Sequence, residues 1–144
     1  MSSLGKDRPR VIGTLSERIA LYQTAGFVLS KMEDSGLFSQ QDLDSLQSVI
    51  LGFLREPEPR LLGYCSYSKN HKIAKNAGER TWRILVKRSL LYSDDGELCL
   101  TLYHEFLHGI LGPRVGHGPL FQSYEEKWHS IRIGSGRVSG KTNS

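Results

Sequence analysis

The chain has 144 residues and a mass of 16.2 kDa, enough for one domain with its own hydrophobic core and too short for several domains. Its apolar runs are far too short for a transmembrane helix, and residues 1–10 contain no apolar stretch typical of a signal peptide. The two cysteines, Cys65 and Cys99, do not form a closely spaced pair. We therefore expect a monomer inside the cell, in the cytoplasm or associated with the nucleus or nucleoid.

Charge is unevenly distributed along the chain. The net charge is +4, and residues 69–88 are strongly basic, while residues 31–58 are mainly acidic. The basic stretch predicts contact with DNA or another polyanion, and the alternative is a solvated face of mixed charge. Its candidate nucleic-acid-binding residues are Lys69, Lys72, Lys75 and Arg80.

The first part of the chain predicts two helices. Thr14 and Glu17 form a capping box, and Gly36 ends the first helix. A second helix is expected to begin at Ser39 and to continue to Leu54, before Pro57. The apolar residues at helical spacing, which we expect in the core, are Leu15, Ile19, Tyr22, Ala25, Leu29 and Met32 in the first helix and Leu43, Leu46, Val49, Ile50, Phe53 and Leu54 in the second.

The pattern then changes to that of strands. Residues 61–67 are a short apolar run, residues 69–80 read as a loop, and residues 81–87 alternate between apolar and polar side chains. We expect an antiparallel pair, with room for a third strand that the sequence does not locate. As an edge strand, residues 81–87 would hold an extended peptide by main-chain hydrogen bonds, with Arg83, Leu85 and Lys87 as substrate-binding residues.

Two further helices are expected, one from residues 94–97 to Gly112 and one from Pro119 through Trp128. The prediction is an α+β fold with about four helices and a small antiparallel sheet. Residues 14–130 form the domain, between a flexible arm at 1–13 and a flexible basic tail at 131–144.

The third expected helix carries an H-E-x-x-H motif, His104-Glu105-Phe106-Leu107-His108. Residues four apart lie on the same face of a helix, so both imidazoles can reach one metal ion. Zinc is the expected ion, and Glu105 is placed to act as a general base on a zinc-bound water. Chance occurrence on an amphipathic helix is the alternative interpretation.

A catalytic zinc site needs a third protein ligand. His117 is favoured, because Gly112, Pro113 and Gly116 allow the chain to turn back after the helix. Glu125 or Glu126 on the next helix remains an alternative. The spacing excludes the metzincin pattern, which requires glycine and histidine at positions that Leu111 and Arg114 occupy here.

Four blocks of the sequence together resemble a SprT-like domain, the family that includes the Spartan proteases. They are Gly63-Tyr64-Cys65-Ser66-Tyr67, Arg83-Ile84-Leu85-Val86 with Ser89-Leu90-Leu91, the segment from Thr101 to Gly109, and His117-Gly118-Pro119-Leu120-Phe121. The resemblance covers residues 15 to 130. It implies a zincin-like fold with zinc on His104, His108 and His117, Glu105 as general base, and cleavage of proteins trapped on DNA.

The chain departs from this family in two respects. The interval between His108 and His117 is short, and no cysteine pair follows the H-G-P-L-F block, so the zinc-ribbon segment of many relatives has no counterpart in the 144 residues. Two other interpretations therefore stay open: a small metallopeptidase without a DNA role, and a zinc-stabilised binding module without catalysis. The oxyanion-stabilising residue is also open among Tyr103, Arg114, Tyr124 and His129, and Cys65 is a candidate for quenching the zinc.

Overall fold

The structure is a computed structural model, and it describes residues 12–55, 62–68, 81–93, 96–112 and 115–133. The first elements are the helices α2 (Leu15–Ser35) and α3 (Gln40–Ser45), followed by a 3-10 turn at Leu46–Ser48. Strands β1 (Ile50–Phe53), β2 (Gly63–Ser68) and β3 (Thr81–Val86) come next. A second 3-10 turn (Arg88–Tyr92) leads to helices α5 (Glu97–Leu111), α6 (Pro119–Glu125) and α7 (Trp128–Ile133). The expected α+β class is confirmed.

The ends of α2 agree with the sequence. The Thr14 hydroxyl accepts a hydrogen bond from the Glu17 amide, and the Glu17 carboxylate accepts one from the Thr14 amide. Gly36 closes the helix with a φ of 72°, the left-handed conformation that glycine adopts without strain. The buried face of α2 includes Ala25 and Met32, as expected. The expectation is wrong for Leu15, Ile19 and Tyr22, which are exposed, and the core stripe is Leu21, Ala25, Val28 and Met32.

The expected second helix is correct at its start and wrong at its end. Ser39 accepts a hydrogen bond from the Asp42 amide and caps α3. The helix stops at Ser45, and Ile50–Phe53 forms β1. A short apolar run fits a helix and a buried strand equally well by period, and only the β-branched Val49 and Ile50 favour the strand.

The sheet has the order β1-β3-β2, and it is mixed, not purely antiparallel. β2 pairs antiparallel with β3, as expected, with Cys65 opposite Ile84. β1 is the strand that the sequence did not locate, and it pairs parallel with β3, with Leu51 opposite Ile84. β3 is therefore the central strand among the described residues, and the expectation that it lies at an edge is wrong.

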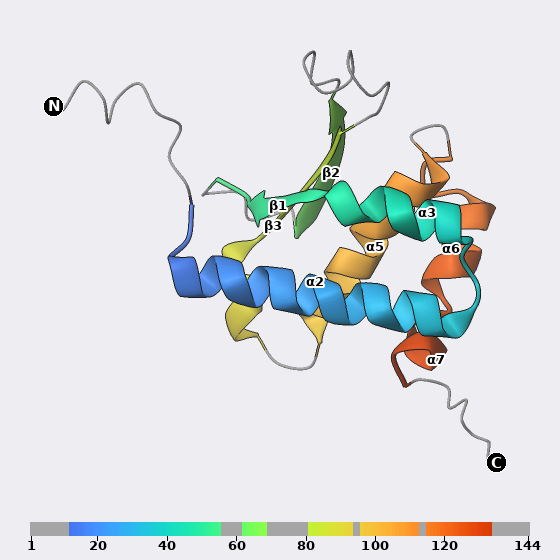
Figure 1. Ribbon diagram of the computed structural model, residues 1–144, viewed down its shortest axis with the longest axis horizontal. Helices are drawn as coiled ribbons and strands as arrows, with labels where there is room; N and C mark the ends of the chain where they lie inside the picture. The colour runs from blue at the N-terminus through green and yellow to red at the C-terminus, as the bar shows by residue number, and fades with distance from the viewer. Residues whose placement is uncertain (1–11, 56–61, 69–80, 94–95, 113–114, 134–144) are drawn as a thin grey trace, which may run out of the picture.

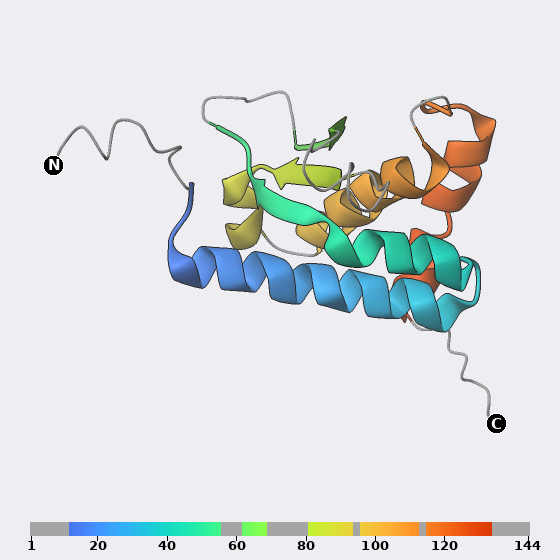
Figure 2. The same cartoon turned by 45° about the horizontal axis from the view of Figure 1, so that its top comes forward.

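Helix α5 lies at the centre of the molecule, against α2 on one side and against β2 and β3 on the other (Figures 1 and 2). Leu102, Tyr103 and Leu107 are fully buried, and Phe106 is 1% exposed. α6 contacts α5, and Trp128, the first residue of α7, stacks on Tyr103 in the middle of α5 with ring centroids 4.9 Å apart. The helix with the H-E-x-x-H motif is thus held by α2, by α6 and by two strands of the sheet.

The packed part of the chain is slightly longer than the predicted domain, residues 14–130. Ile12 packs against the core, and a Cβ on Gly13 would lie 2.6 Å from the Phe53 ring. At the other end, Ile131 is 4% exposed and belongs to the core, so the tail does not begin at residue 131. No helix in the described ranges combines the length and the apolar character needed to cross a lipid bilayer.

Candidate metal centre

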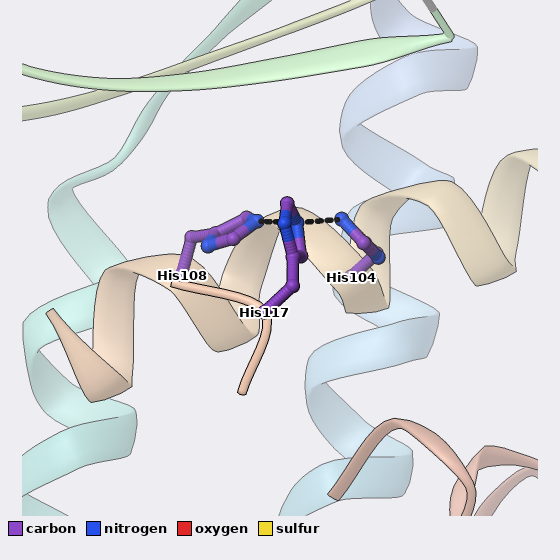
Figure 3. Close-up of side chains that lie close together, drawn as sticks. All are labelled: His104, His108 and His117. Atoms are coloured by element: carbon purple, nitrogen blue, oxygen red, sulfur yellow. Dashed lines mark hydrogen bonds between the residues drawn. The ribbon is translucent and has the colours of Figure 1, made fainter. Parts of the chain in front are cut away.

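Three histidine side chains meet at one point on the surface of α5 (Figure 3). The Nε2 atom of His117 lies 3.0 Å from Nε2 of His108 and 3.3 Å from Nε2 of His104. All three ligand atoms lie within 4.8 Å of one another, so these residues can hold a metal ion. His104 and His108 are half-buried and His117 is exposed, which leaves one side of the group open to solvent.

The local sequence explains why His117 reaches the other two. Gly112 ends α5 with a φ of 88°, and its amide donates to the His108 carbonyl. Gly116, with a φ of 59°, turns the chain again, and Pro119 occupies the first turn of α6. The chain therefore doubles back over α5 and presents His117 from the turn before α6.

Phe121 forms the floor beneath the three imidazoles. It is fully buried, and its ring centroid lies 4.5 Å from that of His108, 4.9 Å from that of His104 and 5.1 Å from that of His117. A rigid aromatic ring in contact with all three imidazoles limits their rotamers. Phe121 is the last residue of the H-G-P-L-F block, which the sequence analysis singled out without this role.

The alternative glutamate ligands occupy other positions. Glu125 Oε2 lies 2.5 Å from Nδ1 of His104, the ring nitrogen that faces away from the other histidines. A carboxylate on Nδ1 fixes the tautomer that leaves Nε2 free for a metal. Glu126 is exposed, and neither glutamate belongs to the group of ligand atoms found in the described part of the chain. The sequence analysis missed this orienting role of Glu125.

Glu105 lies on the inner side of the same helix. It is 5% exposed, and a Cβ on Gly63 at the start of β2 would lie 2.8 Å from its Oε2 atom. Burial raises the pKa of the Glu105 carboxyl to about 7, although the nearby His104 acts in the opposite direction. A carboxylate with a pKa near neutrality is suited to accept and return a proton.

Burial also favours the neutral form of His108. It lowers the pKa of His108 to about 4, with further contributions from His104 and His117. Neutral imidazole is the form that binds metals. Burial, with Glu105 nearby, raises the pKa of the Cys65 thiol to about 12, so this thiol is not a thiolate at neutral pH. Cys65 is absent from the ligand group, and the idea that it quenches the metal gains no support.

The donor set fits a zinc ion. Two nitrogens that bind one zinc ion at about 2.0–2.1 Å, with tetrahedral angles, lie about 3.3 Å apart. The two Nε2 separations of 3.0 and 3.3 Å are close to this value. Three imidazoles with an open fourth side are also the ligand arrangement of catalytic rather than structural zinc sites.

The expected substrate-binding residues do not lie on an edge. β3 forms hydrogen bonds to β1 and to β2, so it has no free main-chain edge for a peptide. Arg83 is exposed and Leu85 and Lys87 are half-buried; a role for their side chains stays a prediction. The predicted DNA-contacting residues Lys69, Lys72, Lys75 and Arg80 lie outside the described residues.

Of the candidate oxyanion-stabilising residues, Tyr103 is excluded, because it is fully buried and its hydroxyl donates to the Tyr124 carbonyl over 2.6 Å. His129 is exposed and contacts Arg132. Tyr124 is half-buried, and Arg114 lies outside the described residues.

No protein-family model matches this sequence, and neither a curated protein nor a solved structure is significantly similar to it. The case for a function therefore depends on the residues of the centre itself.

Proposed function

We propose that the chain is a zinc-dependent endopeptidase of the SprT-like type, with a zincin-like fold around α5. The observation that carries the proposal is the convergence of the Nε2 atoms of His104, His108 and His117 next to a buried glutamate on the same helix. A structural zinc site needs ligands only, whereas Glu105 is held beside the ligands without belonging to them. This difference favours a catalytic centre over a zinc-stabilised binding module.

In this proposal His104, His108 and His117 hold the zinc ion. When bound, zinc supplies Lewis acidity, which polarises a peptide carbonyl and lowers the pKa of water. Glu105 accepts the proton of the attacking water and later returns it to the leaving amine.

We further propose that the peptide lies along β2. This strand is an edge strand of the sheet in the described part of the chain, and its first residue, Gly63, lies against Glu105. An extended peptide that pairs with the outer edge of β2 would pass beside the proposed base. The edge role that the sequence analysis gave to residues 81–87 thus moves to β2.

The substrate class is the finer part of the proposal. The resemblance to SprT-like domains and the basic stretch at residues 69–88 support proteins bound or crosslinked to DNA. A small metallopeptidase without a DNA role is the second candidate, since the donor set alone does not require DNA.

The test is cleavage of a DNA-bound basic protein by the zinc-loaded chain, with and without single-stranded DNA. Glu105→Gln should abolish cleavage while zinc binding persists, and Glu126→Gln, an exposed glutamate outside the centre, should have no effect. Cleavage that depends on DNA would support the DNA-coupled protease, and cleavage indifferent to DNA would support the second candidate. Zinc binding without any cleavage would overturn the peptidase assignment.

A further inference from the structure

Helix α2 presents an apolar stripe to solvent. Leu15 is 64% exposed, Ile19 48% and Tyr22 50%, at positions four and three residues apart on one face. The core stripe of α2, from Leu21 to Met32, lies on a different face. Because the core does not need these three side chains, their apolar character requires another explanation.

The stripe borders a groove between α2 and β1. The groove has a volume of about 610 Å³, and its lining residues are Leu15, Arg18, Ile19, Tyr22, Gln23 and Leu51. The Tyr22 hydroxyl accepts a hydrogen bond of 3.1 Å from the Leu51 amide. This bond occupies an outward N–H of the edge strand β1, so a partner strand cannot pair there. An occupant of the groove must instead be held by side-chain contacts.

Arg18 is the one cation among the lining residues. Its Nε atom is buried, and it has no hydrogen-bond partner. The neighbouring Glu17 does not serve it, because the Glu17 carboxylate accepts hydrogen bonds from the Thr14 amide, from Tyr92 and from Arg88. Solvent cannot reach this Nε atom, so a ligand does not bind to it; the charge of the guanidinium of Arg18, which lines the groove, is what a carboxylate of a partner would pair with.

We propose that this groove binds a short apolar segment of a partner protein, with an acidic side chain of that segment paired to Arg18. The apolar lining recognises the segment, and the guanidinium selects its charge. None of the lining residues belongs to the histidine centre. The start of α2 and helix α6 lie at opposite ends of the molecule (Figures 1 and 2). A protein bound in the groove therefore leaves the histidines accessible.

Two other occupants fit less well. A second copy of the chain paired symmetrically through this groove would bring a second Arg18 to the same interface, and like charges brought together there are unfavourable. The chain's own residues 1–11 carry Lys6, Arg8 and Arg10 against Asp7. This excess of positive charge opposes pairing with Arg18.

The test is selection of a random-peptide display library on the folded full-length chain, followed by synthesis of the enriched peptides. We expect enriched sequences to combine apolar residues with aspartate or glutamate. Ile19→Asp and Arg18→Glu should each weaken their binding about tenfold or more, which corresponds to about 1.4 kcal/mol. Phe27→Asp is the matched control, because Phe27 is 47% exposed on α2 and lies outside the groove. An unchanged midpoint of urea denaturation verifies the fold of each variant.

Several results would overturn the proposal. One is the absence of enriched peptides that depend on Ile19; another is enrichment without any acidic preference. Binding of a synthetic peptide of residues 1–11 that displaces the selected peptides would assign the groove to the chain itself. Dimerisation in sedimentation experiments, lost on Ile19→Asp, would assign it to a second copy.

Discussion

Glu125 and His104 are joined across two helices, with Oε2 of the glutamate 2.5 Å from Nδ1 of the histidine. This contact directs Nε2 of His104 toward His117. The carboxylate comes from the same helix as Phe121, the floor of the centre, and Tyr103 fixes that helix through its hydrogen bond to the Tyr124 carbonyl. The histidines of α5 are thus oriented by groups on α6.

Glu125→Gln should weaken zinc binding. A side-chain amide cannot reproduce the charge of the carboxylate on Nδ1, and loss of such an outer contact reduces metal affinity by about 10–100-fold. Competition with a fluorescent chelator measures the affinity. Glu126→Gln should bind zinc as the unmodified chain does. Equal affinities of the two variants would remove Glu125 from the metal centre.

Phe121→Ala should damage both the fold and the centre. Truncation of a fully buried phenylalanine costs about 3–5 kcal/mol of unfolding free energy. The three imidazoles also lose the ring against which they pack. Urea denaturation in the presence of chelator measures the first effect, and zinc titration measures the second. Phe121→Leu, which keeps part of the volume, should show smaller losses in both; zinc affinity unchanged in both variants would contradict the role of Phe121 as a floor.

Gly63→Ala tests the close approach of β2 to the proposed base. The added methyl group would lie 2.8 Å from Oε2 of Glu105 and from Cγ2 of Thr101, so the carboxylate must shift. A displacement of about 1 Å in a catalytic group can reduce kcat about 100-fold. The zinc affinity should stay that of the unmodified chain, because no histidine is among the three atoms nearest to the added methyl group.

Gly26→Ala is the matched control for this substitution. Gly26 lies within α2, and a Cβ there meets nothing within 4 Å. It should raise the unfolding free energy by about 0.5–1 kcal/mol and leave activity unchanged. If Gly63→Ala cleaved a peptide substrate as fast as Gly26→Ala does, Glu105 would not be positioned by β2.

The candidate centre could be predicted from the sequence because its information is local. His104 and His108 are four residues apart on a helix whose end Gly112 marks, and His117 follows two glycine turns. The orienting carboxylate was harder to predict, because Glu125 was considered only as a ligand. Its position on Nδ1 of His104 depends on the angle between α5 and α6.

The errors in the fold share a different cause. Residues 49–54 can form a helix or a strand by their own pattern, and the choice depends on β3, about 30 residues later in the chain. Likewise, α2 carries two apolar stripes, and local sequence does not say which one α5 will cover. Leu15, Ile19 and Tyr22 satisfy the helical period as well as Leu21, Ala25 and Val28 do.

Glu17 should make stability depend on pH in the acidic range. The hydrogen bond from Tyr92, the bond from the Thr14 amide and the charge of Arg88 hold the pKa of Glu17 below its ordinary value of 4.5. Because the folded state binds the proton less readily than the unfolded state, the contribution of Glu17 is fully present above pH 4.5. This contribution is lost as the pH falls through the lowered folded-state pKa.

Urea denaturation of the chelator-treated protein between pH 7 and pH 3 should therefore show a smaller acid-induced loss of unfolding free energy in Glu17→Gln than in the unmodified chain. Tyr92→Phe, which removes the first of these contacts, should fall between them. Parallel pH profiles for all three proteins would contradict the assignment, and would show that the Thr14 cap stabilises α2 without the ionised carboxylate.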